Sequence, residues 1–594
     1  MIKSFPLVRR SISNEHVMTA VFLVTLLYLL PAWSQAPLKI LEFIAILATA
    51  LLIDAVANFI RYSRPVCAVS SGVTAVILEV LTLGIPFWGR ILGVGFALLI
   101  KHIWGGTGKN IFNPAITALF GLSLFFKIND AVITFSFWLI PVMLLSLVFL
   151  RFRFFAGVGL MSGMVLSLLI HHHWSFQAFV AYGVIFWGCL VITDPVTTTP
   201  QPVAGLLGGF LVGFLTFDIP NFTATRAALF LIFNLLSFAI DQKWFGLDNT
   251  LFFKPLKITS VIPLDSSRDN LLDLTGLQHI RPVKDSELST EEILDRIQTN
   301  QVYGCGGAAF PTIQKIETVI NADVPQKYFI VNGTECDPGL NHDKWLLRRF
   351  PEELSLGIKA IGRCIAFAEV FLAVKHTEGL NFPEGIKIFQ VPEFYPAGAE
   401  KILIAKILQT RLTDNAIPAK LGILVLNVQT VYQIYEACYL NRKADTKYLT
   451  LANLKKKESR VVRVKLGESI HHIVNQIYPA SNLIFSGGGL MQSHLTEDTD
   501  KVETTTNFIA AAHYPRYKES PLCSRCGLCR MYCPARLEVA KIADLVDSGK
   551  IIQVAKYCPE KCISCGSCSY VCLAGRNLSA KVRESKDIID KVQR

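Results

Sequence analysis

Apolar residues run almost without interruption through residues 1 to about 245, and this pattern predicts membrane helices. Several apolar stretches are near the lower limit of about 17 residues for crossing a hydrocarbon core about 30 Å thick, so some predict broken or re-entrant helices. The predicted spans are Val17–Trp33, Leu38–Ile60, Ala68–Leu83, Pro86–Ile103, Phe112–Phe126, Ala131–Leu150, Phe155–Ile170, Ser175–Ile192, Val203–Phe217 and Thr225–Ile240. We therefore expect a polytopic α-helical membrane bundle of about ten helices.

After this half the pattern changes to that of a soluble protein. Alternating strand-like runs occur at Lys327–Asn332 and Ile423–Val428, and Thr290–Thr299 has a polar helical pattern. Strands and helices that follow one another in this way predict an α/β fold. We expect the connection between the two halves to include Trp244–Leu274.

The composition supports this division. Hydrophobic residues make up 52% and charged residues 18% of the 594 residues, and the mean hydropathy is +0.42. An average soluble protein has about 25% charged residues, so a disordered chain and a wholly soluble globule are excluded. The 15 cysteines are too dilute for a small secreted domain held by disulfides. A membrane protein with a soluble part attached remains.

The net charge of +12 has its simplest explanation in loops on the inner side of a membrane. With the N-terminus inside, ten lysines and arginines fall on predicted inner loops and four on outer loops. An even number of spans returns the chain to the same side. We therefore expect the N-terminus and the soluble half on the cytoplasmic side of the inner membrane. Nucleic acid is not an expected partner, because the sequence has no basic stripe with interleaved aromatic residues.

The C-terminal cysteines are the most specific signal in the sequence. They form the motifs Cys523-x-x-Cys526-x-x-Cys529-x-x-x-Cys533 and Cys562-x-x-Cys565-x-x-Cys568-x-x-x-Cys572. In two-cluster ferredoxins the cysteines spaced by two residues bind one iron–sulfur cube, and the fourth cysteine binds the other cube. We therefore expect one [4Fe–4S] cluster on Cys523, Cys526, Cys529 and Cys572, and a second on Cys562, Cys565, Cys568 and Cys533.

Zinc and disulfides are the alternatives for these cysteines. Zinc sites use two pairs of ligands and rarely a third cysteine at the same spacing. Disulfides are disfavoured on the cytoplasmic side inferred above. Cys558 is surplus to both motifs and is either a bystander or a substitute ligand.

Two polar segments of the soluble half predict a nucleotide site. Gly304–Thr312 reads GCGGAAFPT and precedes a helical pattern that contains Lys315. Glycines let a backbone approach a flavin ring or a phosphate, and the N-terminus of the following helix favours an anion. In Tyr328–Gly339 a strand-like run ends in a polar cluster, at the place where α/β sheets bind ligands. The alternatives are an ordinary turn for the first segment and a capped turn for the second.

The two segments resemble the flavoprotein subunit of respiratory complex I and, more closely, the C-type subunit of the Rnf electron-transport complex. In that protein a glycine-rich loop and an N-x-x-E-x-x-P segment precede two [4Fe–4S] motifs. The resemblance covers about Gln301 to Ala574 and includes Gly487–Gly489, which follow a segment resembling the β-grasp-like domain of the same protein. It departs from the family at Ala309, where glycine is usual, and in the absence of an N-terminal barrel-like module.

The resemblance implies FMN and NADH as ligands of the soluble half. Hydride transfer would occur near Glu335, the expected catalytic residue. The implied cofactor-binding residues are Gly304, Gly306, Gly307, Lys315, Asn332 and Asp337.

The membrane half has polar breaks at Trp104–Ala115 (WGGTGKNIFNPA) and Thr193–Val196 (TDPV). At membrane depth such breaks occur only where they line a cavity or are buried in protein, and ordinary cytoplasmic loops are the alternative. The two strings resemble the D-type subunit of Rnf and the B-type subunit of the sodium-pumping NADH:quinone reductase. This resemblance also implies ion translocation, for which the candidate residues are Glu42, Asp54, Glu79 and Asp194.

The resemblance raises the question of a second flavin. Those relatives attach FMN to a threonine in an S-G-A-T motif that follows F-N-P-A, and this chain has only Ser71–Thr74 (SGVT), before it. Covalent attachment at Thr74 is therefore not expected. A noncovalent second flavin in the membrane half stays open.

The whole chain resembles a natural fusion of the D-type with the C-type Rnf subunit. The expected domains are a membrane domain (1–245), a linker (246–300), an α/β FMN- and NADH-binding-like domain (301–455), a β-grasp-like segment (456–515) and a ferredoxin-like domain with two [4Fe–4S] clusters (516–594). The implied function is a membrane-bound oxidoreductase subunit that passes electrons from NADH or a reduced partner through FMN and both clusters. The acceptor would be a membrane flavin, a quinone or a ferredoxin-type partner.

The competing hypothesis is a non-catalytic membrane electron-relay anchor whose nucleotide site has decayed. The expected partners are other membrane and soluble subunits of an electron-transport complex, NAD(H) and membrane lipid.

Overall fold

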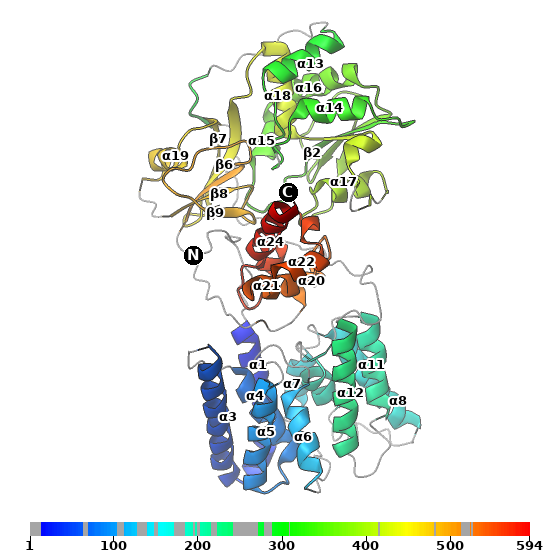
Figure 1. Cartoon of the computed structure of the whole chain (residues 1–594), viewed down its shortest axis with the longest axis vertical. Helices are drawn as coiled ribbons and strands as arrows, with labels where there is room; N and C mark the ends of the chain where they lie inside the picture. The colour runs from blue at the N-terminus through cyan, green and yellow to red at the C-terminus, as the bar shows by residue number, and fades with distance from the viewer. Residues whose placement is uncertain are drawn as a thin grey trace.

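The structure is a computed structural model, and it describes residues 14–62, 69–103, 112–126, 139–147, 153–170, 184–193, 197–198, 202–215, 223–241, 271–277, 288–307, 309–410, 412–413, 416–479, 483–512, 523 and 527–593. Figure 1 shows the helices of residues 14–241 at one end of the long axis and the two sheets at the other. The C-terminal helices that carry the cysteine motifs lie between them (Figure 1).

Helices make up the described part of the N-terminal half, and each predicted span contains helical residues. Within α3 (Leu38–Tyr62), Leu38–Ile60 is the one described segment long and apolar enough to cross a membrane by length and composition. Large apolar side chains such as Leu41 and Leu52 are exposed along it, as expected for contact with lipid. The other helices are α1 (Asn14–Leu27), α2 (Leu30–Gln35), α4 (Val69–Thr82), α5 (Phe87–Ile103), α6 (Pro114–Ser123), α7 (Leu139–Ser146), α8 (Phe154–Ile170), α10 (Val184–Phe186), the π-helix η2 (Trp187–Val191), α11 (Pro202–Leu215) and α12 (Thr223–Asp241).

Helices α8 and α11 approach each other closely through glycines. A Cβ atom at Gly159 would clash with the carbonyl oxygen of Leu206, and one at Gly213 would clash with that of Leu160. Each helix has glycines four residues apart at this contact, the spacing that lets backbones of membrane helices pack together.

A four-stranded parallel sheet forms the centre of the α/β unit, in the order β4-β3-β2-β5. Its strands are β2 (Tyr328–Gly333), β3 (Glu369–Val374), β4 (Ile386–Gln390) and β5 (Ile423–Asn427). The packed helices are α13 (Thr290–Thr299), α14 (Thr312–Ile320), α15 (His342–Arg349), α16 (Pro351–Cys364), α17 (Glu400–Ile407) and α18 (Val428–Leu440). Strands β2 and β5 are runs of buried apolar residues, as expected where helices cover both faces of a parallel sheet.

The second sheet has six strands in the order β1-β7-β6-β10-β8-β9. Two of its neighbouring pairs, β1 with β7 and β6 with β10, are parallel, and the other three are antiparallel. The strands are β1 (Leu271–Asp273), β6 (Thr446–Asn453), β7 (Glu458–Lys465), β8 (Leu483–Gly487), β9 (Ser493–Leu495) and β10 (Phe508–Ala512), accompanied by α19 (Ile470–Ile477).

Two predicted boundaries differ from this arrangement. The boundary at 455/456 falls between β6 and β7, which pair along their full length and belong to one sheet. The linker predicted for 246–300 includes β1, which pairs with β7, and α13, whose Ile293 and Ile297 lie in the core of the α/β unit. Local pattern missed both features, because β1 is only three residues long and acquires its structure from a partner almost 200 positions away.

The C-terminal unit is small and helical. It contains α20 (Leu528–Met531), α21 (Val539–Asp547), α22 (Ile551–Val554), α23 (Ser567–Tyr570) and α24 (Leu578–Gln593). Its core includes Ile542 and Val582 together with cysteines of both motifs. Gly527 and Gly566 precede α20 and α23 in the left-handed conformation, at φ 74° and 75°. The two cysteine motifs therefore have the same local backbone at this position.

Candidate flavin and electron-transfer site

Two asparagines meet at the carboxyl edge of the parallel sheet. Asn332 near the end of β2 and Asn427 at the end of β5 are paired in register. The Asn332 amide donates to the carbonyl of Gly398 (2.9 Å), and the Asn427 amide donates to Oδ2 of Asp343 (2.7 Å). Asn427 also caps α18 by accepting from the N–H of Gln429. The carboxyl edge of parallel strands is where α/β proteins bind ligands.

The glycine-rich loop lies beside Asn427. The N–H of Cys305 donates to Oγ1 of Thr430 (2.9 Å), and its carbonyl accepts from the Asn507 amide (3.1 Å), so α18 and the second sheet both hold the loop. A Cβ atom at Gly306 would lie 3.6 Å from Cβ of Asn427, and one at Gly307 would meet nothing within 4 Å. The loop therefore presents an open backbone face, which suits the flat ring of a flavin.

Lys315 lies on α14 behind this loop. Its ammonium donates to Oε1 of Glu400 (2.7 Å) and to the carbonyl of Val425 (2.9 Å). In the structure Lys315 thus joins α14 to α17 and β5. Its predicted contact with FMN stays a prediction.

Glu335 is held at the N-terminus of α15. Its two carboxylate oxygens accept from the N–H groups of Asp343 (2.9 Å) and Lys344 (3.1 Å). Burial, and next the charge of Asp343, raise the pKa of Glu335 to about 8. The backbone at Glu335 is left-handed (φ 38°), a conformation that is strained for a side chain of this kind. Burial and the neighbouring Asp343 therefore favour the protonated form of Glu335, and the two N–H donors oppose this effect.

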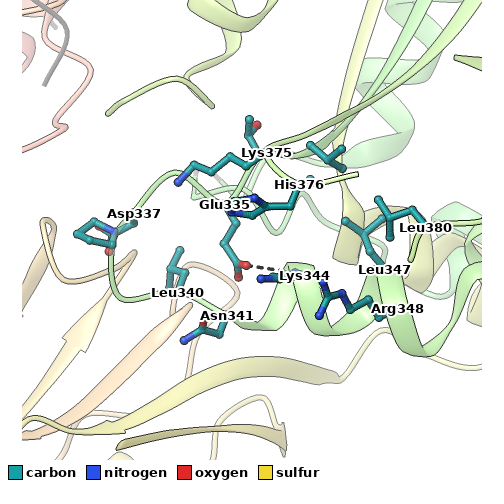
Figure 2. A pocket seen from close by; sticks show the side chains of 14 residues that line it. Glu335, Asp337, Leu340, Asn341, Lys344, Leu347, Arg348, Lys375, His376 and Leu380 are labelled. Carbon is teal, nitrogen blue, oxygen red and sulfur yellow. Dashed lines mark hydrogen bonds between the residues drawn. The ribbon is translucent and has the colours of Figure 1, made fainter. Parts of the chain in front are cut away.

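A cavity of about 130 Å³ opens next to Glu335. Figure 2 shows Lys344 and Arg348 of α15 on one side of it and Lys375, which follows β3, on another. Three cations around a small cavity suit the phosphates of a nucleotide. Of the predicted site residues, the described lining contains Glu335 and Asp337 but none of the glycines of the Gly304–Gly307 loop.

Asp337 connects two domains. Its Oδ1 accepts from the N–H of Gly339 (3.0 Å) and of Leu490 (2.8 Å), and its Oδ2 accepts from the N–H of Met491 (3.0 Å). Burial raises the pKa of Asp337 to about 6, although these hydrogen bonds oppose the rise. The role that the structure shows for Asp337 is to hold the Gly487–Met491 turn, and its predicted contact with a cofactor stays a prediction.

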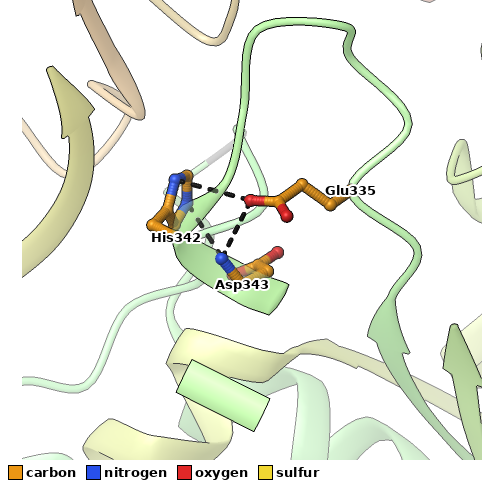
Figure 3. A group of neighbouring side chains, drawn as sticks. All are labelled: Glu335, His342 and Asp343. Atoms are coloured by element: carbon orange, nitrogen blue, oxygen red, sulfur yellow. Dashed lines mark hydrogen bonds and ion pairs between the residues drawn. The ribbon is translucent and has the colours of Figure 1, made fainter. Parts of the chain in front are cut away.

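Glu335, His342 and Asp343 form a compact buried group with one ligand atom from each within 4.8 Å (Figure 3). A divalent cation does not suit this group. Both oxygens of Glu335 already accept N–H groups at the positive end of a helix, and the buried ammonium of Lys447 is near His342 and Asp343. Burial, and next this positive charge, lower the pKa of His342 to about 3, so the imidazole is neutral.

The second cysteine motif and Cys533 lie together. Burial raises the pKa of the Cys533 thiol to about 12, and the nearby Cys565 and Cys562 contribute to the rise. Burial, and next the nearby thiols of Cys565, Cys533 and Cys562, also raise the pKa of the Cys568 thiol. Backbone N–H groups point at two of the sulfurs, from Leu537 to Cys533 and from Ser564 to Cys562, both at 3.4 Å. This donor set fits the predicted crossed ligation of the second [4Fe–4S] cluster.

For the first cluster, Cys523, Cys529 and Cys572 are described and Cys526 lies outside the described residues. Cys529 and Cys572 lie in or against the core of the C-terminal unit. The assignment of this cluster stays a prediction.

Three of the four candidate ion-translocation residues of the membrane half lie in ion pairs, and of these Asp54 and Glu79 are buried while Glu42 is partly exposed. Arg90 on α5 pairs with Glu79 on α4 and with Glu42 on α3. Near the other end of these helices, Asp54 accepts from Lys101 (3.1 Å) and contacts Nε2 of His102 (2.9 Å). Asp194 lies outside the described residues, as do Trp104–Ile111 of the polar break.

Thr74 lies within α4, where it is buried and its hydroxyl donates to the carbonyl of Ser70 (3.0 Å). A phosphate ester at this hydroxyl would have to displace the helices packed against α4. The expectation that no flavin is attached at Thr74 stays a prediction.

Sequence reasoning missed Asn427, Lys375 and Lys447. Asn427 ends one strand and Lys375 follows another, so the carboxyl-edge rule was the available signal. Nothing in the local sequence placed Lys447 near the candidate site, because this residue lies on β6 of the other sheet.

The comparisons with known proteins divide the chain in the same way. Residues 1–142 match the model of the NQR2, RnfD, RnfE family, and residues 297–436 match the model of the Nuo51 FMN-binding domain. The chain joins an RnfD-like segment to a segment like the C-type subunit of Rnf. The first match supports a membrane domain in the N-terminal half, and the second supports a flavin-binding domain in the soluble half.

Three relatives are C-type subunits of ion-translocating oxidoreductase complexes. One from Haemophilus influenzae is 29% identical over 272 residues, which is 43% of this chain and 40% of the relative. One from Rhodobacter capsulatus is 27% identical over 298 residues, 47% of this chain and 56% of the relative. The C-type subunit of the Na⁺-translocating ferredoxin:NAD⁺ oxidoreductase complex of Acetobacterium woodii is 26% identical over 272 residues, 43% and 61% respectively.

The chain therefore spans only part of the length of these curated relatives. Among solved structures, an NAD⁺-reducing [NiFe]-hydrogenase in the air-oxidized state matches at 16% identity with a TM-score of 0.37, over 50% of this chain and 61% of that chain. This score is too low to argue a common fold.

Proposed function

We propose that the chain is a membrane-bound electron-transfer oxidoreductase subunit of an Rnf-type complex. NADH or a reduced partner delivers electrons to FMN in the α/β unit, and they continue through two [4Fe–4S] clusters. A membrane flavin, a quinone or a ferredoxin-type protein accepts them. Ion translocation by the membrane half belongs to this proposal, as do a cytoplasmic soluble half and other subunits as partners.

The observation that carries this proposal is the position of the glycine-rich loop at the carboxyl edge of the parallel sheet. The open backbone of Gly306 and Gly307 lies beside Asn427, which contacts Asp343, the residue that donates a backbone N–H to Glu335. FMN bound there would supply the exchange between a two-electron donor and one-electron acceptors. The cations around the neighbouring cavity would hold nucleotide phosphates.

Glu335 would act beside the reacting atoms. Because burial raises its pKa to about 8, Glu335 would exchange a proton with the reacting groups near neutral pH. The neutral His342 and the buried Asp343 surround it without supplying a compensating charge.

The finer domain assignments have partial support. The strand order β7-β6-β10-β8-β9, with parallel central strands, an antiparallel pair on each side and an accompanying helix, is the arrangement expected of a β-grasp-like domain. The closeness of Cys533 to the second motif supports a ferredoxin-like arrangement of the two clusters.

The relay-anchor hypothesis is the second candidate, and two observations favour it. Ala309 has a left-handed backbone (φ 47°) at the position where the resembling family has glycine. The cavity of about 130 Å³ beside Glu335 is also smaller than the roughly 300 Å³ or more typical of cofactor pockets.

Cofactor analysis of the full chain, purified anaerobically in detergent, tests the proposal. We expect about eight irons per chain, FMN that acid releases, and no flavin that remains on the chain in a denaturing gel. We also expect NADH to bleach the flavin absorbance. Bound FMN that NADH does not bleach would favour the relay anchor, and far fewer irons would contradict the two clusters.

A variant separates catalysis from binding. Glu335→Gln should slow bleaching by NADH at least about tenfold while the bound flavin per chain stays unchanged. Glu384→Gln is the control, because Glu384 is exposed and lies outside the site. Equal bleaching rates in both variants would remove Glu335 from the proposed chemistry.

A further inference from the structure

A tyrosine of the flavin-like domain reaches the second cysteine motif. The hydroxyl of Tyr395 donates to the backbone carbonyl of Cys565 at 2.6 Å, and both residues are buried. Tyr395 lies in the loop between β4 and α17, within the segment that matches the FMN-binding domain model. One buried hydrogen bond therefore connects this domain directly to the backbone between two predicted cluster ligands.

The same junction contains a continuous apolar contact. Tyr395, Met491 and Cys565 belong to one buried cluster, and Cys336 packs against it. Cys336 lies between Glu335 and Asp337, so the candidate catalytic loop itself borders the cysteine motif. Among the described cysteines of the two motifs, Cys565 is the one that belongs to this cluster.

The turn after β8 fills the remaining space. Asp337 accepts the N–H groups of Leu490 and Met491, which fixes this turn against the candidate catalytic loop. A Cβ atom at Gly566 would clash with the carbonyl oxygen of Met491, so the cysteine loop lies directly on the turn. The candidate catalytic loop thus packs on the turn, and the turn packs on the Cys565–Gly566 backbone, with no other element between them among the described residues.

We propose that the cluster bound by Cys533, Cys562, Cys565 and Cys568 is proximal to the flavin and exchanges electrons with it first. Tyr395 is the positioning residue that holds this cluster at its working distance. The cluster of the first cysteine motif is then distal. This inference rests on the proposed function and adds the order of the carriers to it.

The two electrons of a reduced flavin would leave it one at a time. A reduced flavin, when bound, would give one electron to the cluster held by Cys533, Cys562, Cys565 and Cys568, and the electron would pass through the other cluster to a one-electron acceptor protein. A second electron would follow the same path, so that the flavin would end fully oxidised with its protons released to solvent. Because electron transfer slows exponentially with distance, loss of the Tyr395 contact acts on the first of these transfers. A hydrogen bond to the backbone of a ligand also tunes the potential of that cluster alone.

The test uses the full chain in detergent and reduces the flavin with light and EDTA, so that it does not depend on NADH. Rapid freezing and electron paramagnetic resonance then follow the reduction of each cluster. We expect Tyr395→Phe to slow reduction of the proximal cluster by about tenfold and to shift the midpoint potential of that cluster only. Tyr435→Phe is the matched control, because its buried hydroxyl has no hydrogen-bond partner among the described residues.

Cluster deletions identify which cluster comes first. In Cys529→Ser, with the distal cluster removed, the remaining cluster should be reduced at the wild-type rate. In Cys568→Ser the remaining cluster should be reduced at least about tenfold more slowly. Iron content, expected to fall by half, shows that each variant keeps its other cluster.

The opposite pattern in the two deletion variants, or a Tyr395→Phe variant that behaves like Tyr435→Phe, would overturn the proposed order. Failure of NADH to reduce the flavin, with the light-driven order intact, would instead contradict only the NADH part of the proposed function.

Discussion

The carboxylate of Asp337 occupies the space that a Cβ atom at Gly489 would need. The two residues are more than 150 positions apart, and the same carboxylate accepts the N–H groups of Leu490 and Met491. The glycine run and the acidic residue, which appear in the sequence as parts of two separate motifs, are therefore one contact between the two sheet-containing units.

Gly489→Ala should destabilise this junction by about 2–4 kcal/mol, because the added methyl group displaces a buried carboxylate from its hydrogen bonds. Limited proteolysis and thermal unfolding of the full chain measure the effect. Gly362→Ala in α16 is the control, because a Cβ atom there meets nothing within 4 Å. Equal unfolding temperatures for the two variants would show that the junction tolerates the methyl group.

Stability should depend on pH through Glu335. Its pKa is about 8 in the folded protein and 4.5 in the ordinary state, and the coupled Asp343 is shifted in the same direction, to about 6. Between pH 4.5 and 8 the folded chain binds more protons than the unfolded chain, so the stability from this pair falls as pH rises. Above about pH 8 this decrease in stability should end, because Glu335 is then ionised in both the folded and the unfolded chain.

Thermal unfolding of wild type and Glu335→Gln across this pH range measures the dependence. Glutamine keeps the shape of the protonated side chain, so the variant should gain stability relative to wild type as pH rises. Glu384→Gln, at an exposed position, should follow the wild-type curve. Parallel curves for wild type and Glu335→Gln would mean that Glu335 ionises alike in the folded and unfolded chain.

Gly307→Ala should lower the amount of flavin bound per chain. The backbone of Gly307 has φ 113°, which alanine adopts only with strain, and its face is the open surface of the loop. We expect at least about tenfold weaker flavin binding. Acid-released FMN, titrated back into the stripped protein, gives the measurement.

Gly379→Ala is the matched control for this change. Gly379 also has a positive φ, 74°, and a Cβ atom there also meets nothing within 4 Å, but it lies outside the glycine-rich loop. Equal loss of flavin in both variants would indicate general destabilisation instead of a direct effect on the site.

Arg90→Ala should destabilise the membrane half by about 3–5 kcal/mol, since it leaves the buried carboxylate of Glu79 without its cation. Thermal unfolding in detergent measures the loss. The double variant Arg90→Met with Glu79→Gln should recover much of it, because it removes both charges together. A double variant as unstable as Arg90→Ala would show that the charge pair is not the source of the effect.

Much of the candidate site was predictable because its chemistry depends on local spacing. The Gly304–Gly307 loop, the segment that contains Glu335 and the cysteine repeats are each short stretches of consecutive residues, and sequence alone contains them. The cavity beside Glu335 was harder to predict from the sequence, because Lys375 follows another strand and Lys344 lies on the next helix. The structure also assigns Asp337 contacts with the backbone, where the resemblance implied a cofactor ligand.

The sequence by itself determined the apolar half, the soluble half, the strand and helix types and the cysteine motifs, because these depend on hydrophobic period and on short spacings. Only the tertiary structure decided that β1 completes the second sheet, that Arg90 pairs with Glu79, and that Tyr395 contacts Cys565. Such contacts join segments that are far apart in the sequence, so no local pattern predicts them. They form only when the whole core is packed.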